Sequence, residues 1–112
     1  MLNLIKLSEQ GCELGLHGSL GTSTNAMHLL RDMHRAHTAV GIGDRFHYLS
    51  WEPRFTSNLL VVTKTTYDST LGFAEHYGFR HSYCLPFQPF NFADGQAYAF
   101  LEIPLNVMDA TL

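Results

Sequence analysis

A short apolar run, residues 12–16, is the feature that most constrains what this chain can fold into. Gly11 precedes the run, and Gly18 and Gly21 follow it. An apolar run of this length between glycines is typical of a buried strand. The strand delivers His17 to the edge of the sheet, where α/β folds build their sites from the loops that leave the strands. His17 is therefore a candidate to bind a metal or carry a proton, and a core-edge histidine bonded to a neighbouring loop is the alternative.

Segments with strand and helix patterns alternate along the rest of the chain. The clearest helical pattern covers residues 25–38, where apolar side chains recur at three- and four-residue steps behind Ser23 or Thr24 as the N-cap. Strands separated by helices favour parallel pairing, so the predicted fold class is α/β. The expected helices are 2–9, 25–38 and 54–62; the expected strands are 12–16, 66–73 and 98–107, with a brief apolar approach before 44–48 and no regular element in 86–90.

Composition excludes several classes of partner. The 112 residues, 46% hydrophobic and 15% charged, fit one packed domain at most, and the net charge of −3 with seven scattered Lys and Arg gives no basic surface for nucleic acid. No run approaches the roughly 18 apolar residues of a membrane span, and the N-terminal run is too short for a signal peptide. Cys12 and Cys84 show no metal or disulfide spacing. We therefore expect a cytoplasmic protein without a membrane span.

The stretch Glu13-Leu-Gly-Leu-His-Gly-Ser19 resembles the histidine motif of the NodB-like polysaccharide deacetylases, the carbohydrate esterase family-four fold. Further stretches resemble a poorly characterised bacterial branch of that family linked to surface-polysaccharide biosynthesis, in the same order over nearly the whole chain. The resemblance implies a partial, distorted (β/α) barrel with its N-terminal strands missing. Residues 1–112 would then be a fragment of one catalytic domain, its middle and C-terminal part. These further stretches are 43–49, 67–73, 78–80, 86–87, 102–105 and 108–112.

The resemblance also implies an activity: a metal-dependent hydrolase that removes an N-acyl group, such as acetyl, from a sugar, sugar nucleotide or polysaccharide, and that is inactive as this fragment. In the family a divalent metal, often zinc, is held by an aspartate and two histidines and activates water. His17 matches the first histidine. His47 is the candidate for the second, because the family's usual position is occupied by Gly21. The family's opening aspartate motif lies upstream of the present residues.

The other site assignments follow from the same resemblance. Arg45 matches the family's arginine loosely, and Asp109 follows the last strand, where a carboxylate can hold a catalytic histidine without binding metal. Arg80 either clamps an anionic group or pairs with Glu75. The expected catalytic residues are Arg45 and Asp109, the expected metal ligands are His17 and His47, and the expected substrate-binding residues are Ser19, Tyr48, Trp51, Arg80 and Phe87.

Two carboxylates are assigned mainly structural positions. Asp68 is expected to cap a turn rather than serve the site, and Glu102 is expected to point outward into solvent.

Competing hypotheses remain beside the hydrolase. One is a carbohydrate-binding or scaffolding relative that kept an aromatic mouth, and another is a metal-free α/β module. An incomplete barrel would leave the first strand with an open edge, so we expect marginal stability and self-association through it. His17 and His47 should meet at one rim, with their nitrogens roughly 3 to 4 Å apart if both ligate one zinc ion. The aromatic mouth would comprise Tyr48, Trp51, Phe73, Phe87 and Phe90.

Overall fold

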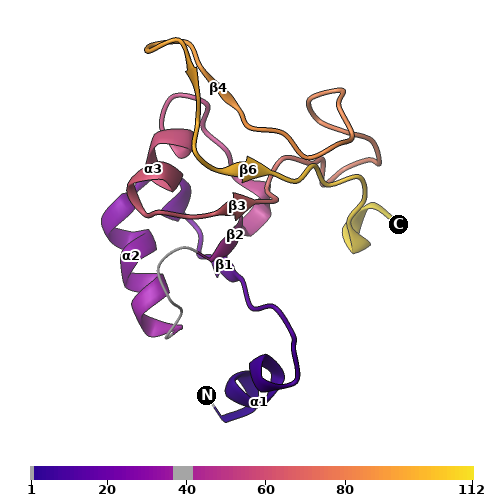
Figure 1. Ribbon diagram of the computed structural model, residues 1–112. Helices are drawn as coiled ribbons and strands as arrows, with labels where there is room; N and C mark the ends of the chain where they lie inside the picture. Colours follow the sequence, from indigo (N-terminus) through magenta and orange to yellow (C-terminus); the bar gives the residue numbers. More distant parts are fainter. Residues whose placement is uncertain (1, 37–41) are drawn as a thin grey trace.

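A four-stranded parallel sheet organises this protein, whose computed structural model describes residues 2–36 and 42–112 (Figure 1). Each strand is parallel to its neighbour, and the strand order follows the chain from one edge to the other. This arrangement confirms the predicted α/β class. In order across the sheet, the strands are β1 (Leu16–Gly18), β2 (Gly43–Phe46), β3 (Tyr67–Asp68) and β6 (Leu101–Glu102).

Two helices pack against one face of the sheet. Helix α2 (Ala26–Arg35) connects β1 to β2, and α3 (Thr56–Val62) connects β2 to β3. Leu16 and Phe46 lie on the same face of the sheet, because Leu16 pairs with Asp44 and side chains two residues apart in a strand point the same way. Both pack against residues of the two helices, so this is the helix-covered face. The core is formed by Leu16, Leu29, Met33, Phe46, Leu59, Leu60 and Phe100.

Asn25 caps helix α2, and its side chain accepts a hydrogen bond from the His28 N–H at 3.1 Å. The prediction of Ser23 or Thr24 as the N-cap is wrong, because both residues lie in the preceding 3₁₀ turn, Thr22–Thr24. There Ser23 is buried, and its hydroxyl bonds that of Ser50. The expected end of this helix at residue 38 lies outside the described residues.

Helix α1 (Leu2–Glu9) has the predicted bounds and extends away from the sheet (Figure 1). Gly11 ends it with φ of 85°, the left-handed conformation that favours glycine. Two bonds complete this termination: Gly11 N–H to Ser8 O at 3.0 Å and Cys12 N–H to Leu7 O at 3.0 Å.

The strands are shorter than predicted because regular pairing covers only a few residues. Residues 12–15 have no strand partner, so β1 begins at Leu16 and includes His17. Strand β3 ends at Asp68, whose carboxylate accepts bonds from the Thr70 N–H and hydroxyl, both at 2.8 Å, and so turns the chain. The expected strand 98–107 is regular only over β6.

The segment between β3 and β6 carries a small hairpin of β4 (Phe90–Asn91) and β5 (Gln96–Ala97). The predicted absence of regular structure in 86–90 is wrong at two points: Phe90 belongs to β4, and Phe87 pairs with Glu102 in an antiparallel bridge. Pro89 is compatible with this hairpin, because its carbonyl accepts a hydrogen bond from the Tyr98 N–H and its position needs no N–H donor.

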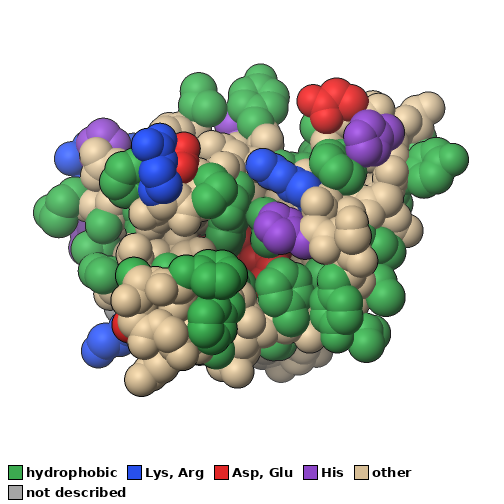
Figure 2. Space-filling view, turned by 90° about the horizontal axis from the view of Figure 1, so that it is seen from above, with side chains coloured by type: hydrophobic (Ala, Val, Ile, Leu, Met, Phe, Trp, Pro, Cys, Tyr) green, Lys and Arg blue, Asp and Glu red, His purple; other side chains and the backbone are tan. Residues whose placement is uncertain are grey.

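Many large apolar side chains lie on the surface. Phe92 at the hairpin is 90% exposed, and Leu4, Ile5 and Leu7 of α1 are all exposed. Figure 2 shows hydrophobic side chains spread over the face seen from above. Within residues 2–36 and 42–112, no helix has both the length and the apolar character needed to cross a membrane.

Candidate functional site

Two histidines face each other at the carboxyl end of the sheet. His17 is the central residue of β1, and His47 follows β2 directly. Nε2 of His17 lies 3.4 Å from Nδ1 of His47, and the two ring planes are 87° apart. The rings therefore share one rim, as the strand pattern predicts, while their role as metal ligands stays a prediction.

A strained turn presents the second histidine. Tyr48 and Leu49 have φ of 58° and 52°, in the left-handed region that side chains other than glycine rarely adopt. Such residues cost about 1 to 3 kcal/mol each and persist where surrounding packing holds them. Here Leu49 is buried. The turn also brings the rings of His47 and Tyr48 to 4.2 Å between centroids.

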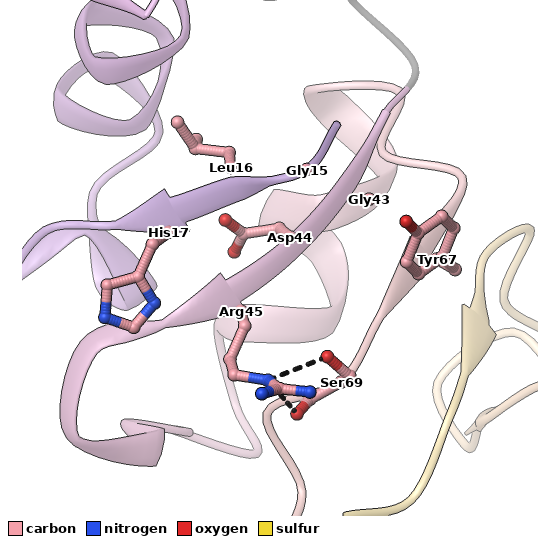
Figure 3. A pocket seen from close by; sticks show the side chains of 8 residues that line it. All are labelled: Gly15, Leu16, His17, Gly43, Asp44, Arg45, Tyr67 and Ser69. Atoms are coloured by element: carbon pink, nitrogen blue, oxygen red, sulfur yellow. Dashed lines mark hydrogen bonds between the residues drawn. The ribbon is translucent and has the colours of Figure 1, made fainter. Parts of the chain in front are cut away.

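Arg45 lies beside His17 on the open face of the sheet, because the two residues are partners in the β1–β2 register (Figure 3). Its Nε donates to the Ser69 hydroxyl at 2.9 Å and to the Ser69 carbonyl at 3.2 Å. Ser69 thus fixes the guanidinium next to the histidine pair. The hollow on this face, about 270 Å³, is lined by Gly15, Leu16, His17, Gly43, Asp44, Arg45, Tyr67 and Ser69.

Glycine makes room for one wall of that hollow. A Cβ atom on Gly43 would lie only 2.0 Å from the ring of Tyr67, so the ring occupies the space above the strand. The neighbouring Glu13 carboxyl group, and then burial, raise the pKa of Tyr67. The Tyr67 hydroxyl also lies 3.9 Å from where a Cβ atom on Gly15 would stand, so the side chain of β3 reaches the segment before β1.

Three carboxyl groups lie side by side on the covered face of the sheet. Asp44 pairs with Asp68 and Asp68 with Glu102 in the strand registers, and the three are 3%, 0% and 0% exposed. The expectation that Glu102 points into solvent is wrong, because its register with Asp68 places its side chain on the covered face, where Oε1 accepts from the Leu71 N–H. Asp68 caps a turn, as predicted.

Asp44 is the least satisfied of the three. Within the described residues, neither of its carboxylate oxygens has a hydrogen-bond partner. Burial, followed by the charge of Asp68, raises the pKa of Asp44 to about 7. The amides of Gly18 and Arg45 are near enough to oppose this rise in part, but neither meets the geometry of a hydrogen bond.

The carboxyl groups of Asp68 and Glu102 are neighbours in the β3–β6 register. Glu102 Oε1 accepts from the Leu71 N–H at 3.0 Å, while Oε2 has no hydrogen-bond partner among the described residues. Burial first, and then the charge of Asp68, raise the pKa of Glu102 to about 10, and burial raises the pKa of Asp68 to about 6. Glu102 is therefore the protonated member of the pair at neutral pH.

A second hollow, of about 480 Å³, is lined in part by Tyr48; we call it the aromatic pocket. It brings together three of the expected substrate-binding residues, Tyr48, Trp51 and Arg80. Tyr48 is 74% exposed, and Trp51 is half-buried against Phe100. The pocket is lined by Tyr48, Leu49, Ser50, Trp51, Gly72, Phe73, Ala74, Glu75 and Arg80.

The other expected site residues lie outside these two hollows. The Ser19 N–H donates to Asp32 at 2.9 Å; burial raises the pKa of Asp32, but the Ser19 bonds outweigh it and lower the pKa. Phe87 contacts the ring of Tyr83. Asp109 is exposed in a 3₁₀ turn after β6, the strand at the opposite edge from β1, and accepts from the Ala110 N–H at 3.0 Å. Its role in a reaction stays a prediction.

Fold and site together define an α/β protein with a histidine pair at the carboxyl edge of a parallel sheet. Across the described ranges, no group of three His, Cys, Asp or Glu side chains is arranged to hold a metal ion. Comparisons with protein-family models, with curated proteins and with solved structures find no match to this chain.

Proposed function

We propose that the histidine pair is part of the metal site of a hydrolase that removes an N-acyl group from a sugar, sugar nucleotide or polysaccharide, as in the NodB-like deacetylases. The proposal depends on one observation above all: two imidazole nitrogens from neighbouring parallel strands are 3.4 Å apart. This spacing fits two ligands of a tetrahedral zinc ion, whose bonds to nitrogen are about 2.0 to 2.1 Å.

A bound divalent metal, zinc by preference, would polarise the amide carbonyl and lower the pKa of a coordinated water. His17 and His47 would hold the metal. Arg45, which Ser69 fixes on the same face, would donate hydrogen bonds to a substrate oxygen. The Tyr67 ring closes one side of the hollow and limits the size of the group that enters it.

The fold supports this proposal at a coarser level. Consecutive parallel strands β1, β2 and β3 with both connecting helices on one face are compatible with the wall of a (β/α) barrel. We place the activity in the cytoplasm. Both cysteines, Cys12 and Cys84, are exposed free thiols, which suits a reducing compartment.

Metal titration tests the proposal. Isothermal titration calorimetry should detect zinc binding when zinc chloride is added to the protein. His17→Gln or His47→Gln should weaken zinc binding by about tenfold or more, because each substitution removes a ligand. His28→Gln, an exposed histidine on α2, is the matched control. Equal zinc binding by all four proteins would contradict the proposal.

A non-catalytic carbohydrate-binding protein is the second candidate, and the aromatic pocket favours it. Aromatic side chains in a hollow of this size suit a sugar ring. Titrations separate the two functions: sugar binding by a protein that does not bind zinc through His17 and His47 would support the binding protein.

A further inference from the structure

Tyr48 is a neighbour of both the aromatic pocket and the histidine pair. Tyr48 lines the pocket, and the centroid of its ring lies 4.2 Å from that of His47. Tyr48 and Leu49 both adopt the left-handed backbone conformation here. The pocket and the proposed metal site therefore share Tyr48 as a neighbouring residue.

Arg80 is the positively charged residue that lines this pocket. Its Nη1 donates to the Leu49 carbonyl at 3.3 Å, and within the described part of the chain it forms no ion pair. The alternative pairing with Glu75 is thus not formed, although both side chains line the pocket. A guanidinium has five donors in a planar fork that matches a carboxylate or a phosphate.

We propose that the aromatic pocket binds a sugar bearing an anionic substituent, a carboxylate or a phosphate, which Arg80 holds. The inference rests on the proposed function and names its substrate class. Tyr48, Trp51 and Phe73 offer apolar ring surface to the sugar, and Arg80 selects the charge.

The neighbouring ionisable groups allow this assignment. Burial, and then the charge of Arg80, lower the pKa of His81, which disfavours a second positive charge beside Arg80. Glu75 is exposed, and its carboxylate can accept bonds from sugar hydroxyls. Glu75 would also repel an anion placed near it, which orients the anionic substituent toward Arg80.

Calorimetric titration without metal tests the inference, because binding requires no turnover. The three probes are an N-acetylated hexosaminuronic acid, an N-acetylhexosamine 1-phosphate and the neutral N-acetylhexosamine. At least one anionic probe should bind about tenfold or more tightly than the neutral one, as expected for charge-assisted hydrogen bonds. The tighter of the two anionic probes identifies the substituent.

Substitution at Arg80 completes the test. Arg80→Gln should abolish the preference for the anionic probe, and Arg80→Lys should retain part of the preference. Arg54→Gln, at a surface arginine paired with Glu52 outside the pocket, should change neither affinity. Equal binding of all three probes by the wild type, or a preference that survives Arg80→Gln, would overturn the inference.

The double variant His17→Gln/His47→Gln separates this inference from the proposed function. If the wild type prefers an anionic probe but does not bind zinc, the hydrolase is rejected and the anionic pocket is kept. Zinc binding that depends on both histidines, without charge preference, would reject the pocket alone.

Discussion

Asp44 has a carboxyl group that the fold buries without a hydrogen-bond partner among the described residues. Its pKa rises from 3.8 to about 7 on folding, so the native state binds this proton more tightly than the unfolded state does. Stability from this group is complete below about pH 4 and is lost as the pH rises through about 7. Three pKa units correspond to about 4 kcal/mol as an upper limit.

Asp44→Asn should therefore flatten the pH dependence of the free energy of unfolding between about pH 4 and 7. At pH 8 the variant should be more stable than the wild type by about 2 kcal/mol, because no charge is buried. Urea unfolding at several pH values measures this. Asp94→Asn, in the exposed hairpin, is the control and should keep the wild-type slope; the same slope in Asp44→Asn would contradict the assignment.

Glu102 offers a second test at the residue scale. Glu102→Gln should have little effect on stability at pH 7, because the amide is neutral like the protonated acid and its oxygen can accept from the Leu71 N–H. Glu102→Ala should cost about 2 to 4 kcal/mol, since it leaves that N–H unpaired and a cavity behind. A Gln variant as unstable as the Ala variant in urea would show that Glu102 is charged.

Sequence reasoning did not find this carboxyl row, although a signal was present. Asp44, Asp68 and Glu102 each occupy a short strand of the parallel sheet, and parallel register places equivalent positions side by side. The position of Glu102 within a strand suggests an outward side chain, but its register with Asp68 places it on the covered face. Such long-range coverage is not encoded in the local pattern.

At the scale of elements, prediction succeeded where local chemistry decides the outcome. Helix α1 has the predicted bounds because Gly11 terminates it through local bonds, and the histidines meet because parallel strands end at one edge. Strand lengths failed, since a strand exists only where a partner lies beside it. The left-handed turn at Tyr48 also escaped prediction, because neither Tyr48 nor Leu49 favours that conformation.

Gly18 joins two elements, and its substitution should be costly. A Cβ atom there would lie 2.7 Å from the Phe46 ring, which is fully buried, and 2.9 Å from the Thr22 hydroxyl. Gly18→Ala should destabilise the protein by about 1 to 3 kcal/mol through overpacking. Chemical denaturation measures the loss, and adding Phe46→Leu should reduce the cost of the alanine. Strictly additive losses would show that the two sites do not touch.

At the scale of the whole molecule, the open edge of the sheet predicts association. Strand β1 is an edge of the sheet, and an unpaired edge can pair with another chain. Sedimentation velocity should show a mass that rises with concentration, and hydrogen exchange at β1 should slow as it does so. Replacing Phe90 and Phe92 of the hairpin by Ser is the control and should leave association unchanged. A monomer at all concentrations would refute the prediction.

Trp51 gives the aromatic pocket an optical property. It is the single tryptophan of the chain, it lines the pocket, and it lies 6.4 Å from the core ring of Phe100. Fluorescence excited selectively from tryptophan therefore comes from Trp51 alone, in the lining of the aromatic pocket. An unlabelled protein thus carries its own emission reporter of what enters the pocket, and the emission maximum should shift to shorter wavelength as a ligand displaces water from the indole.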